Sequence, residues 1–188
     1  FQVTIYEKKD SIEINEGYGI QLSVNSVELL NKIGFNSVSD EEKFNPLNID
    51  FFEIKNSKKF CDLNISKFNS ENCKYTTLKR SKLLQFLING LKDKIIKYNY
   101  SINRIEYDKD LINLIFDNGE KKKHDYLIIS DGVFSKGKSL ISANKFNAIY
   151  NSSIAIRGNI SQKNFQNLNE KNISLFLGSN FHYVIYPV

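Results

Sequence analysis

The chain has 188 residues, of which 41% are hydrophobic and 13% aromatic, and a formal net charge of +5. A chain of this size buries one sizeable core or most of two small ones. No apolar run approaches the roughly 20 residues that a membrane-spanning helix needs, and no stretch has the pattern of a signal peptide. We therefore expect a cytoplasmic protein without a transmembrane segment.

The positive charge does not indicate nucleic-acid binding. The chain has 23 Lys, 24 Asn and only 3 Arg, a bias typical of AT-rich codons, and acidic residues are interleaved with the basic ones. The longest basic run, at residues 121–123, falls at a predicted hairpin or loop, where a solvated turn is favoured over a phosphate-binding patch. Two Cys and two His are too few soft ligands for a metal site. We expect neither a nucleic-acid partner nor a metal.

Alternation and helical periodicity predict the elements of the first half. In chain order these are a strand at residues 1–7, a loop at 10–17, a helix at 24–34 closed by Gly34, two strands at 50–55 and 58–64 joined by a tight turn at 56–57, and a helix at 78–91. The chain opens inside the first strand without any preceding segment to pair with it. We therefore expect an internal fragment of a longer protein.

The second half is predicted to be richer in strands. In chain order we expect strands at 101–108, 111–116 and 122–130 with turns at 109–110 and 118–119, a short helix around Gly137, a long strand at 148–160, a short helix at 162–168, and strands at 173–177 and 182–186. A βαβ-like start followed by antiparallel strands predicts a mixed α/β (α+β) fold of two interleaved parts. Residues 1–50 and 75–140 would form the dinucleotide-binding part, and residues 50–75 and 148–188 a mainly antiparallel sheet.

Two early segments have the residue types of a dinucleotide site. Glu7 ends the first strand, where an acid accepts hydrogen bonds from ribose hydroxyls in dinucleotide-binding folds. Gly17-Tyr-Gly19-Ile20-Gln21-Leu22 leads into the first helix. Glycine allows positive φ or close approach of a ligand to the backbone, and a helix start offers unpaired N–H groups. A simple turn into a helix needs only one of the two glycines.

Two later segments add an anion-binding group and an acceptor. Arg80 is one of three arginines in a lysine-rich chain and begins the second predicted helix; a guanidinium donates in one plane to phosphate or hydroxyl oxygens. Asp131-Gly132 follows an apolar predicted strand, and it combines a short acceptor with a residue that lacks Cβ. In isolation, a strand followed by Asp-Gly is also a common turn.

In this order and at these spacings, the segments resemble the FAD-dependent aromatic-ring hydroxylases, the single-component flavoprotein monooxygenases of the salicylate and para-hydroxybenzoate hydroxylase type. The resemblance implies a Rossmann-like FAD-binding domain interleaved with a mainly antiparallel substrate-domain sheet. Lys82 departs from the family pattern, which usually has an acidic residue two positions after the arginine. The residues that the resemblance assigns to FAD are Glu7, Gly19, Ile20, Gln21, Arg80, Asp131 and Gly132.

The end of the chain resembles the salicylate-hydroxylase branch. The resemblance rests on two segments, Ile154-Ala-Ile-Arg157-Gly158 and Phe181-His182-Tyr-Val-Ile-Tyr186-Pro187-Val188. Aromatic and His side chains on such a sheet wall a pocket for a planar phenol. The resemblance therefore implies substrate contact by His182, Tyr186 and Pro187, whereas the catalytic residues stay unidentified.

The implied activity is that of an FAD- and NAD(P)H-dependent monooxygenase. Reduced flavin would react with O2, and a flavin hydroperoxide would transfer one oxygen atom to an aromatic, phenolic ring. The partners would be a small aromatic substrate and O2, and the isolated fragment is expected to be inactive. The sequence does not predict the oligomeric state.

Two alternatives stay open. The first is a hydroxylase of ubiquinone biosynthesis acting on a prenylated phenol, which would bring peripheral membrane contact through its quinone-precursor substrate. The second is a flavin-binding protein without hydroxylase activity, or an inactive gene fragment. The His-x-x-x-Tyr-Pro-Val ending at residues 182–188 disfavours the first alternative.

Overall fold

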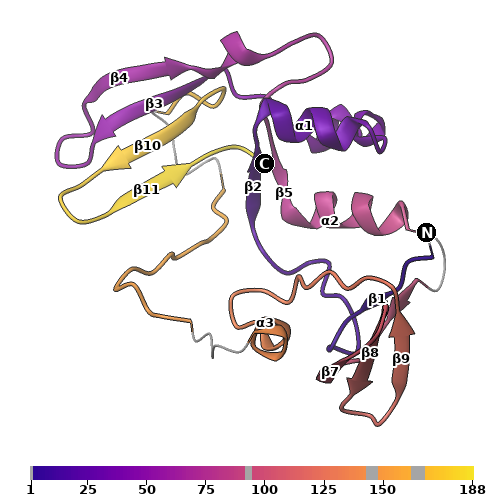
Figure 1. The fold of residues 1–188 in the computed structure, drawn as a ribbon. Coiled ribbons are helices and arrows are strands. Elements are labelled where there is room, and N and C mark those ends of the chain that lie inside the picture. The colour runs from indigo at the N-terminus through magenta and orange to yellow at the C-terminus, as the bar shows by residue number, and fades with distance from the viewer. Residues whose placement is uncertain (1, 92–94, 143–147, 162–167) are drawn as a thin grey trace. The chain divides into compact units, whose positions relative to one another are not determined.

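The computed structural model describes residues 2–91, 95–142, 148–161 and 168–188. The chain divides into two compact units (Figure 1). Unit 1 comprises residues 1–12 and 92–155, and unit 2 comprises residues 13–91 and 156–188. Helices and several small sheets occur together, so the predicted mixed α/β class is confirmed.

Unit 1 is built mainly from strands. Its elements are β1 (Ile5–Tyr6), β6 (Ile96–Lys97), β7 (Ile102–Asp108), β8 (Leu111–Phe116), β9 (Lys121–His124) and helix α3 (Lys136–Ile141). Strands β1 and β6 pair in parallel, whereas β7, β8 and β9 form the antiparallel meander that the sequence predicts. Positive φ at Lys109 and Gly119 confirms the two predicted turns.

One predicted strand of unit 1 is too long. Strand β9 ends at His124, and residues 125–130 belong to no sheet. Leu127 and Ile129 still pack against the core around Leu114, while Ile128 is 88% exposed. The alternation of the sequence therefore matches the alternation of buried and exposed side chains. The segment is held by side-chain packing and not by hydrogen bonds to a neighbouring strand.

Unit 2 contains a four-stranded sheet, a two-stranded ribbon and two helices. Its elements are β2 (Gly19–Leu22), α1 (Val24–Asn31), β3 (Asn48–Glu53), β4 (Lys59–Asn64), β5 (Thr76–Lys79), α2 (Arg80–Asn89), β10 (Ile173–Leu177), β11 (His182–Ile185) and the 3-10 helices η1 (Phe35–Ser37), η2 (Asp40–Glu42) and η3 (Ile65–Phe68). The sheet order is β11-β10-β3-β4, with β10 parallel to β3 and the other neighbours antiparallel.

The ribbon of β2 and β5 is the element that the sequence did not predict. Its four residue pairs run from Gly19 with Lys79 to Leu22 with Thr76. The second helix therefore begins at Arg80, two residues later than expected, because the preceding residues are strand. Helix α1 likewise ends at Asn31, and Gly34 follows it with φ of +96°.

The core of unit 2 lies on one side of this ribbon. Leu78 is fully buried there with Phe35, Val27 and Leu22. Leu30 of α1 and Leu83 and Phe86 of α2 pack against the same cluster, whereas Leu87 of α2 is exposed. Because successive side chains of a strand point to opposite faces, burial of this side determines which residues of the ribbon point away from the core.

The four-stranded sheet carries a buried polar contact and a row of stacked rings. Asp50 is only 3% exposed; its Oδ2 accepts a hydrogen bond from Asn172 Nδ2 at 2.6 Å, and its Oδ1 forms an ion pair with Lys59 Nζ at 2.7 Å. Hydrogen bonds to Asp50 and Asp62 raise the pKa of Lys59. Rings of Phe52, Phe176 and Tyr183 stack across β3, β10 and β11. Side-chain contacts therefore stabilise the sheet in addition to the backbone hydrogen bonds between its strands.

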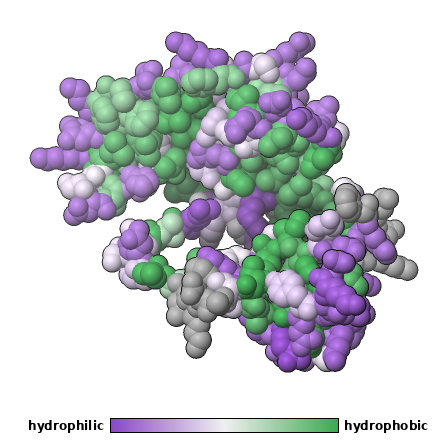
Figure 2. Space-filling view, in the orientation of Figure 1, coloured by the Kyte–Doolittle hydropathy of each residue, from purple (hydrophilic) through white to green (hydrophobic). Residues whose placement is uncertain are grey.

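Apolar side chains remain exposed over this sheet (Figure 2). They include Phe60, Leu63, Phe181 and Val184. The predicted strand at residues 148–160 is wrong, because these residues are exposed and lie outside all strands. The predicted helix at 162–168 falls almost entirely outside the described residues. Within the described part, no helix is long and apolar enough to cross a membrane.

Candidate functional site

The outward face of the ribbon collects several of the predicted site residues. Residues paired across antiparallel strands share a face, so Gly19 with Lys79 and Gln21 with Thr77 lie on the side opposite the core. Ile20 points the other way and packs against the core cluster. A ligand on the outward face would meet the Gln21 side chain, but only the backbone of Ile20.

Arg80 and the glycine loop converge as the motif order predicts. The Arg80 amide donates to Tyr18 O at 2.8 Å, and its Nη1 donates to Glu16 O at 2.9 Å. Gly17 has φ of +97°, and a Cβ there would lie 2.8 Å from Arg80 Cδ. Glycine is thus required at position 17 for its conformation and for the arginine stem beside it.

Gly19 is covered by the end of the chain. A Cβ at this position would lie 2.6 Å from Tyr186 Cε2 and 2.8 Å from Val188 Cγ1. The buried Thr77 hydroxyl donates to Pro187 O at 2.5 Å and anchors the same segment. Gly19, Gln21, Tyr186 and Pro187, which the sequence assigned to cofactor and substrate, therefore lie together on one face of the ribbon.

Tyr75 belongs to this cluster and was missed by sequence reasoning. Its hydroxyl donates to Gln21 Oε1 at 2.7 Å. Burial raises the pKa of Tyr75, and the neighbouring Tyr186 raises it further. Burial also raises the pKa of Tyr186, against an opposing effect of Arg157. The signal was the alternation of Tyr75, Thr77 and Lys79, which becomes visible once residues 76–79 are taken as a strand.

His182 lies apart from this cluster along the strand. It begins β11, pairs with Leu177 of β10 and is exposed. Residues 182 and 186 are four apart and so lie on the same side of an extended chain. The structure brings Tyr186, but not His182, into contact with the glycine segment.

Asp131 and Gly132 belong to unit 1. Asp131 Oδ2 accepts from Gly137 N at 2.8 Å, and Oδ1 accepts from the Ser135 hydroxyl. Burial opposes ionisation, but the hydrogen bonds from Ser135 and from backbone amides outweigh it, so the pKa of Asp131 is lowered. Gly132 has φ of +84° with open space around its Cα. Both residues line a cleft of about 300 Å³ with Ile129.

Glu7 is the remaining predicted cofactor residue and also lies in unit 1. Its amide donates to Lys97 O at 2.9 Å, which continues the parallel pairing of β1 and β6. Its carboxylate accepts from Lys9 N at 2.9 Å. Glu7 therefore directly follows β1, which is shorter than the predicted strand at residues 1–7, and its carboxylate already accepts a hydrogen bond from its own loop.

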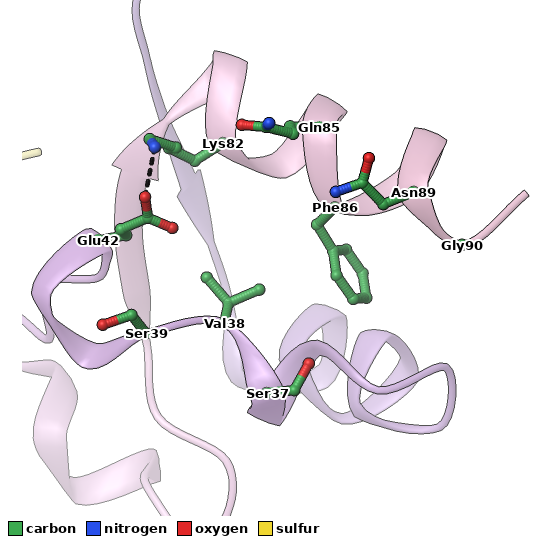
Figure 3. Close-up of a pocket in the computed structure, with 9 residues that line it drawn as sticks. All are labelled: Ser37, Val38, Ser39, Glu42, Lys82, Gln85, Phe86, Asn89 and Gly90. Carbon is green, nitrogen blue, oxygen red and sulfur yellow. Dashed lines mark ion pairs between the residues drawn. The ribbon is translucent and has the colours of Figure 1, made fainter.

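The departure at Lys82 has a local explanation. Lys82 forms an ion pair with Glu42 of η2 (Figure 3). The pair lies on the rim of a polar cleft of about 550 Å³, beside which the Phe86 ring packs against Phe35. None of the predicted site residues lines this cleft. Among the described residues, no group of three His, Cys, Asp or Glu could hold a metal ion.

Comparison with known proteins shows similarity in structure but not in sequence. No family model and no curated protein matches the chain. Klebsiella pneumoniae HpxO complexed with FAD and uric acid is similar with a TM-score of 0.72 at 15% identity, over 97% of this chain and 46% of its own. 2,6-Dihydroxypyridine-3-hydroxylase from Arthrobacter nicotinovorans gives 0.72 at 14% identity, over 98% and 45%.

A third solved structure covers less of the chain. Tetracycline destructase Tet(55) gives a TM-score of 0.56 at 20% identity, over 76% of this chain and 35% of its own length. The chain thus spans between about a third and just under half of the structures it matches. These comparisons establish that the chain has the fold of FAD-binding monooxygenase domains.

The packing of Tyr186 on Gly19 predicts the effect of adding one methyl group. We expect Gly19→Ala to lower the free energy of unfolding by about 1–3 kcal/mol, because Tyr186 and Val188 must move. Urea unfolding measures it. Gly158→Ala is the matched control, since nothing lies within 4 Å of its Cβ position. A smaller cost of Gly19→Ala in a Tyr186→Ala background is also expected, and an undiminished cost would contradict the contact.

The lowered pKa of Asp131 predicts acid sensitivity. The fold favours its ionised form, so the stability it contributes is present above the usual carboxyl pKa of 3.8 and is lost as pH falls through its lower folded pKa. In Asp131→Asn the thermal midpoint should fall less steeply between about pH 5 and pH 3 than in the wild type. Asp110→Asn, in a hairpin turn of the same unit, should keep the wild-type slope. Equal slopes for all three proteins would argue against the assignment.

Proposed function

We propose that the chain is part of an FAD- and NAD(P)H-dependent monooxygenase that hydroxylates a small aromatic substrate. The observation that carries the proposal is the convergence of the glycine loop, Arg80, Gln21 and Tyr186 on the β2–β5 ribbon. Tyr186 comes from a segment more than a hundred positions after the other residues. The shared fold of an FAD-complexed structure supports the same conclusion.

The residues present fit the chemistry of FAD. Within the described residues, Arg80 uses one of its five N–H donors on Glu16 O, and the others stay free for phosphate or hydroxyl oxygens. Gly132 has open space at its Cβ position, which lets a ligand approach the backbone there. We assign Glu7, Gly19, Ile20, Gln21, Arg80, Asp131 and Gly132 to the cofactor, with Ile20 acting through its backbone.

Each group of residues has a definite task in this proposal. Bound FAD supplies the redox chemistry with NAD(P)H and O2. Arg80 and Gln21 bind and orient the cofactor by donating hydrogen bonds. The Tyr186 ring and Pro187, held on the ribbon through Thr77, wall the aromatic site and exclude water from it. His182 would contact substrate from the same side of β11 as Tyr186.

Cofactor binding is the first test. The purified full-length protein should carry FAD, visible in its absorbance spectrum after gel filtration. We expect Arg80→Ala to weaken FAD binding at least about 10-fold, since hydrogen bonds to charged groups contribute about 1.5–3 kcal/mol each. Arg104→Ala is the control, because Arg104 is exposed and pairs only with Glu106 among the described residues. A colourless protein that takes up no added FAD would refute the proposal.

Substrate class is the second test. NAD(P)H oxidation by the full-length protein should accelerate on addition of salicylate-like phenols, because an aromatic ring completes the site that Tyr186 walls. A panel of mono- and dihydroxybenzoates, measured at 340 nm with oxygen uptake in parallel, provides the readout. Alicyclic acids of similar size and charge serve as controls. Equal rates with both groups would count against an aromatic substrate.

A further inference from the structure

Tyr75 contacts a proposed cofactor residue although no part of the motif includes it. The residue precedes β5, and its hydroxyl donates to Gln21 Oε1 at 2.7 Å. Gln21 stands directly opposite Thr77 in the ribbon. Tyr75 lies two residues before Thr77, the partner of Gln21 in the ribbon. Its side chain therefore reaches Gln21 on the outward face.

This hydrogen bond determines which end of the Gln21 amide is free. A primary amide has an acceptor oxygen and a donor NH2 group, and a phenol O–H is a good donor. Because Tyr75 donates to Oε1, the orientation of the amide is set and both N–H donors of the NH2 group are left available. Among the described residues, none accepts a hydrogen bond from Gln21 Nε2.

The surroundings make the contact effective. Tyr75 and Gln21 are both half-buried, so water competes less for their hydrogen bond than at the surface. Gly19 lies two residues before Gln21 on the same face, in contact with Tyr186. The free amide NH2 therefore belongs to the face where cofactor and substrate residues converge.

We propose that Tyr75 is a positioning residue that holds the Gln21 amide with its NH2 group available to an acceptor oxygen of bound FAD. The inference rests on the proposed function and extends it to a residue outside the motifs. Without the hydroxyl, the amide rotates freely and loses conformational entropy when it binds. Tyr75 acts through Gln21 and not by touching the cofactor.

A double-mutant cycle on FAD affinity tests this. In the full-length protein, Tyr75→Phe removes one oxygen atom and keeps the ring. We expect FAD to dissociate about 2- to 10-fold more readily, the range of one hydrogen bond. In a Gln21→Ala background, Tyr75→Phe should have no further effect. Tyr107→Phe, at an exposed position of β7, is the matched control and should bind FAD as the wild type does.

The outcomes separate the inference from the function on which it rests. Wild-type protein that binds no FAD refutes both. FAD binding with an equal effect of Tyr75→Phe in both backgrounds refutes only the positioning role, because Tyr75 would then act on the fold in general. No effect in either background refutes it as well. Thermal unfolding of the FAD-free variants shows whether a lost affinity merely follows lost stability, which would also overturn the proposal.

Discussion

The pairing of β2 with β5 is the interaction on which the candidate site depends. Four residue pairs join two segments that lie more than fifty positions apart in the sequence. Leu78 and Leu22 bury one side of the ribbon in the core, which leaves Gly19 and Gln21 on the other side by alternation alone. The pairing ends where α2 begins. Arg80, the first residue of α2, therefore lies beside the glycine loop and donates hydrogen bonds to Tyr18 O and Glu16 O. A one-residue shift in register would exchange the core and ligand faces.

Glycine at positions 17 and 19 has different physical causes. Gly17 needs positive φ and yields space to the stem of Arg80, whereas Gly19 yields space to Tyr186 and Val188. Both causes lie within the chain and act before any ligand is bound. The Gly-x-Gly pattern is thus a folding requirement that assembles the site, since it lets an arginine and a tyrosine from distant segments approach one loop.

The sequence predicted most of the periodic elements, including the short strands β10 and β11, and missed the β2–β5 ribbon. The β7–β8–β9 meander, the β3–β4 hairpin and the two helices follow from alternation, turn residues and helical spacing. Strands β2 and β5 are no shorter than β9 and β11, but Gly19 is a poor strand former and the predicted helix at 78–91 overlaps β5. The opposite error occurred at residues 148–160, where apolar alternation is present but the side chains are exposed. The alternation there favours an extended backbone, but no neighbouring strand in the described part of the chain pairs with the segment. A strand needs such a neighbour, because its backbone N–H and C=O groups must be hydrogen-bonded. Tyr75 was missed for the same reason as β5.

The motif residues differ in what they still offer a ligand. The resemblance assigns Asp131 to the cofactor, yet its two oxygens already accept hydrogen bonds from Ser135 and Gly137, so its first role is to fix the start of α3. Glu7 likewise accepts from its own loop. Within the described residues, Arg80 and Gln21 are the members with unused donors. Gln21 is half-buried, so its unused NH2 donors are costly unless a ligand or water satisfies them, whereas Arg80 is exposed and water can satisfy its remaining donors. The case for an acceptor-rich cofactor therefore depends more on the ribbon of unit 2 than on the Asp-Gly turn of unit 1.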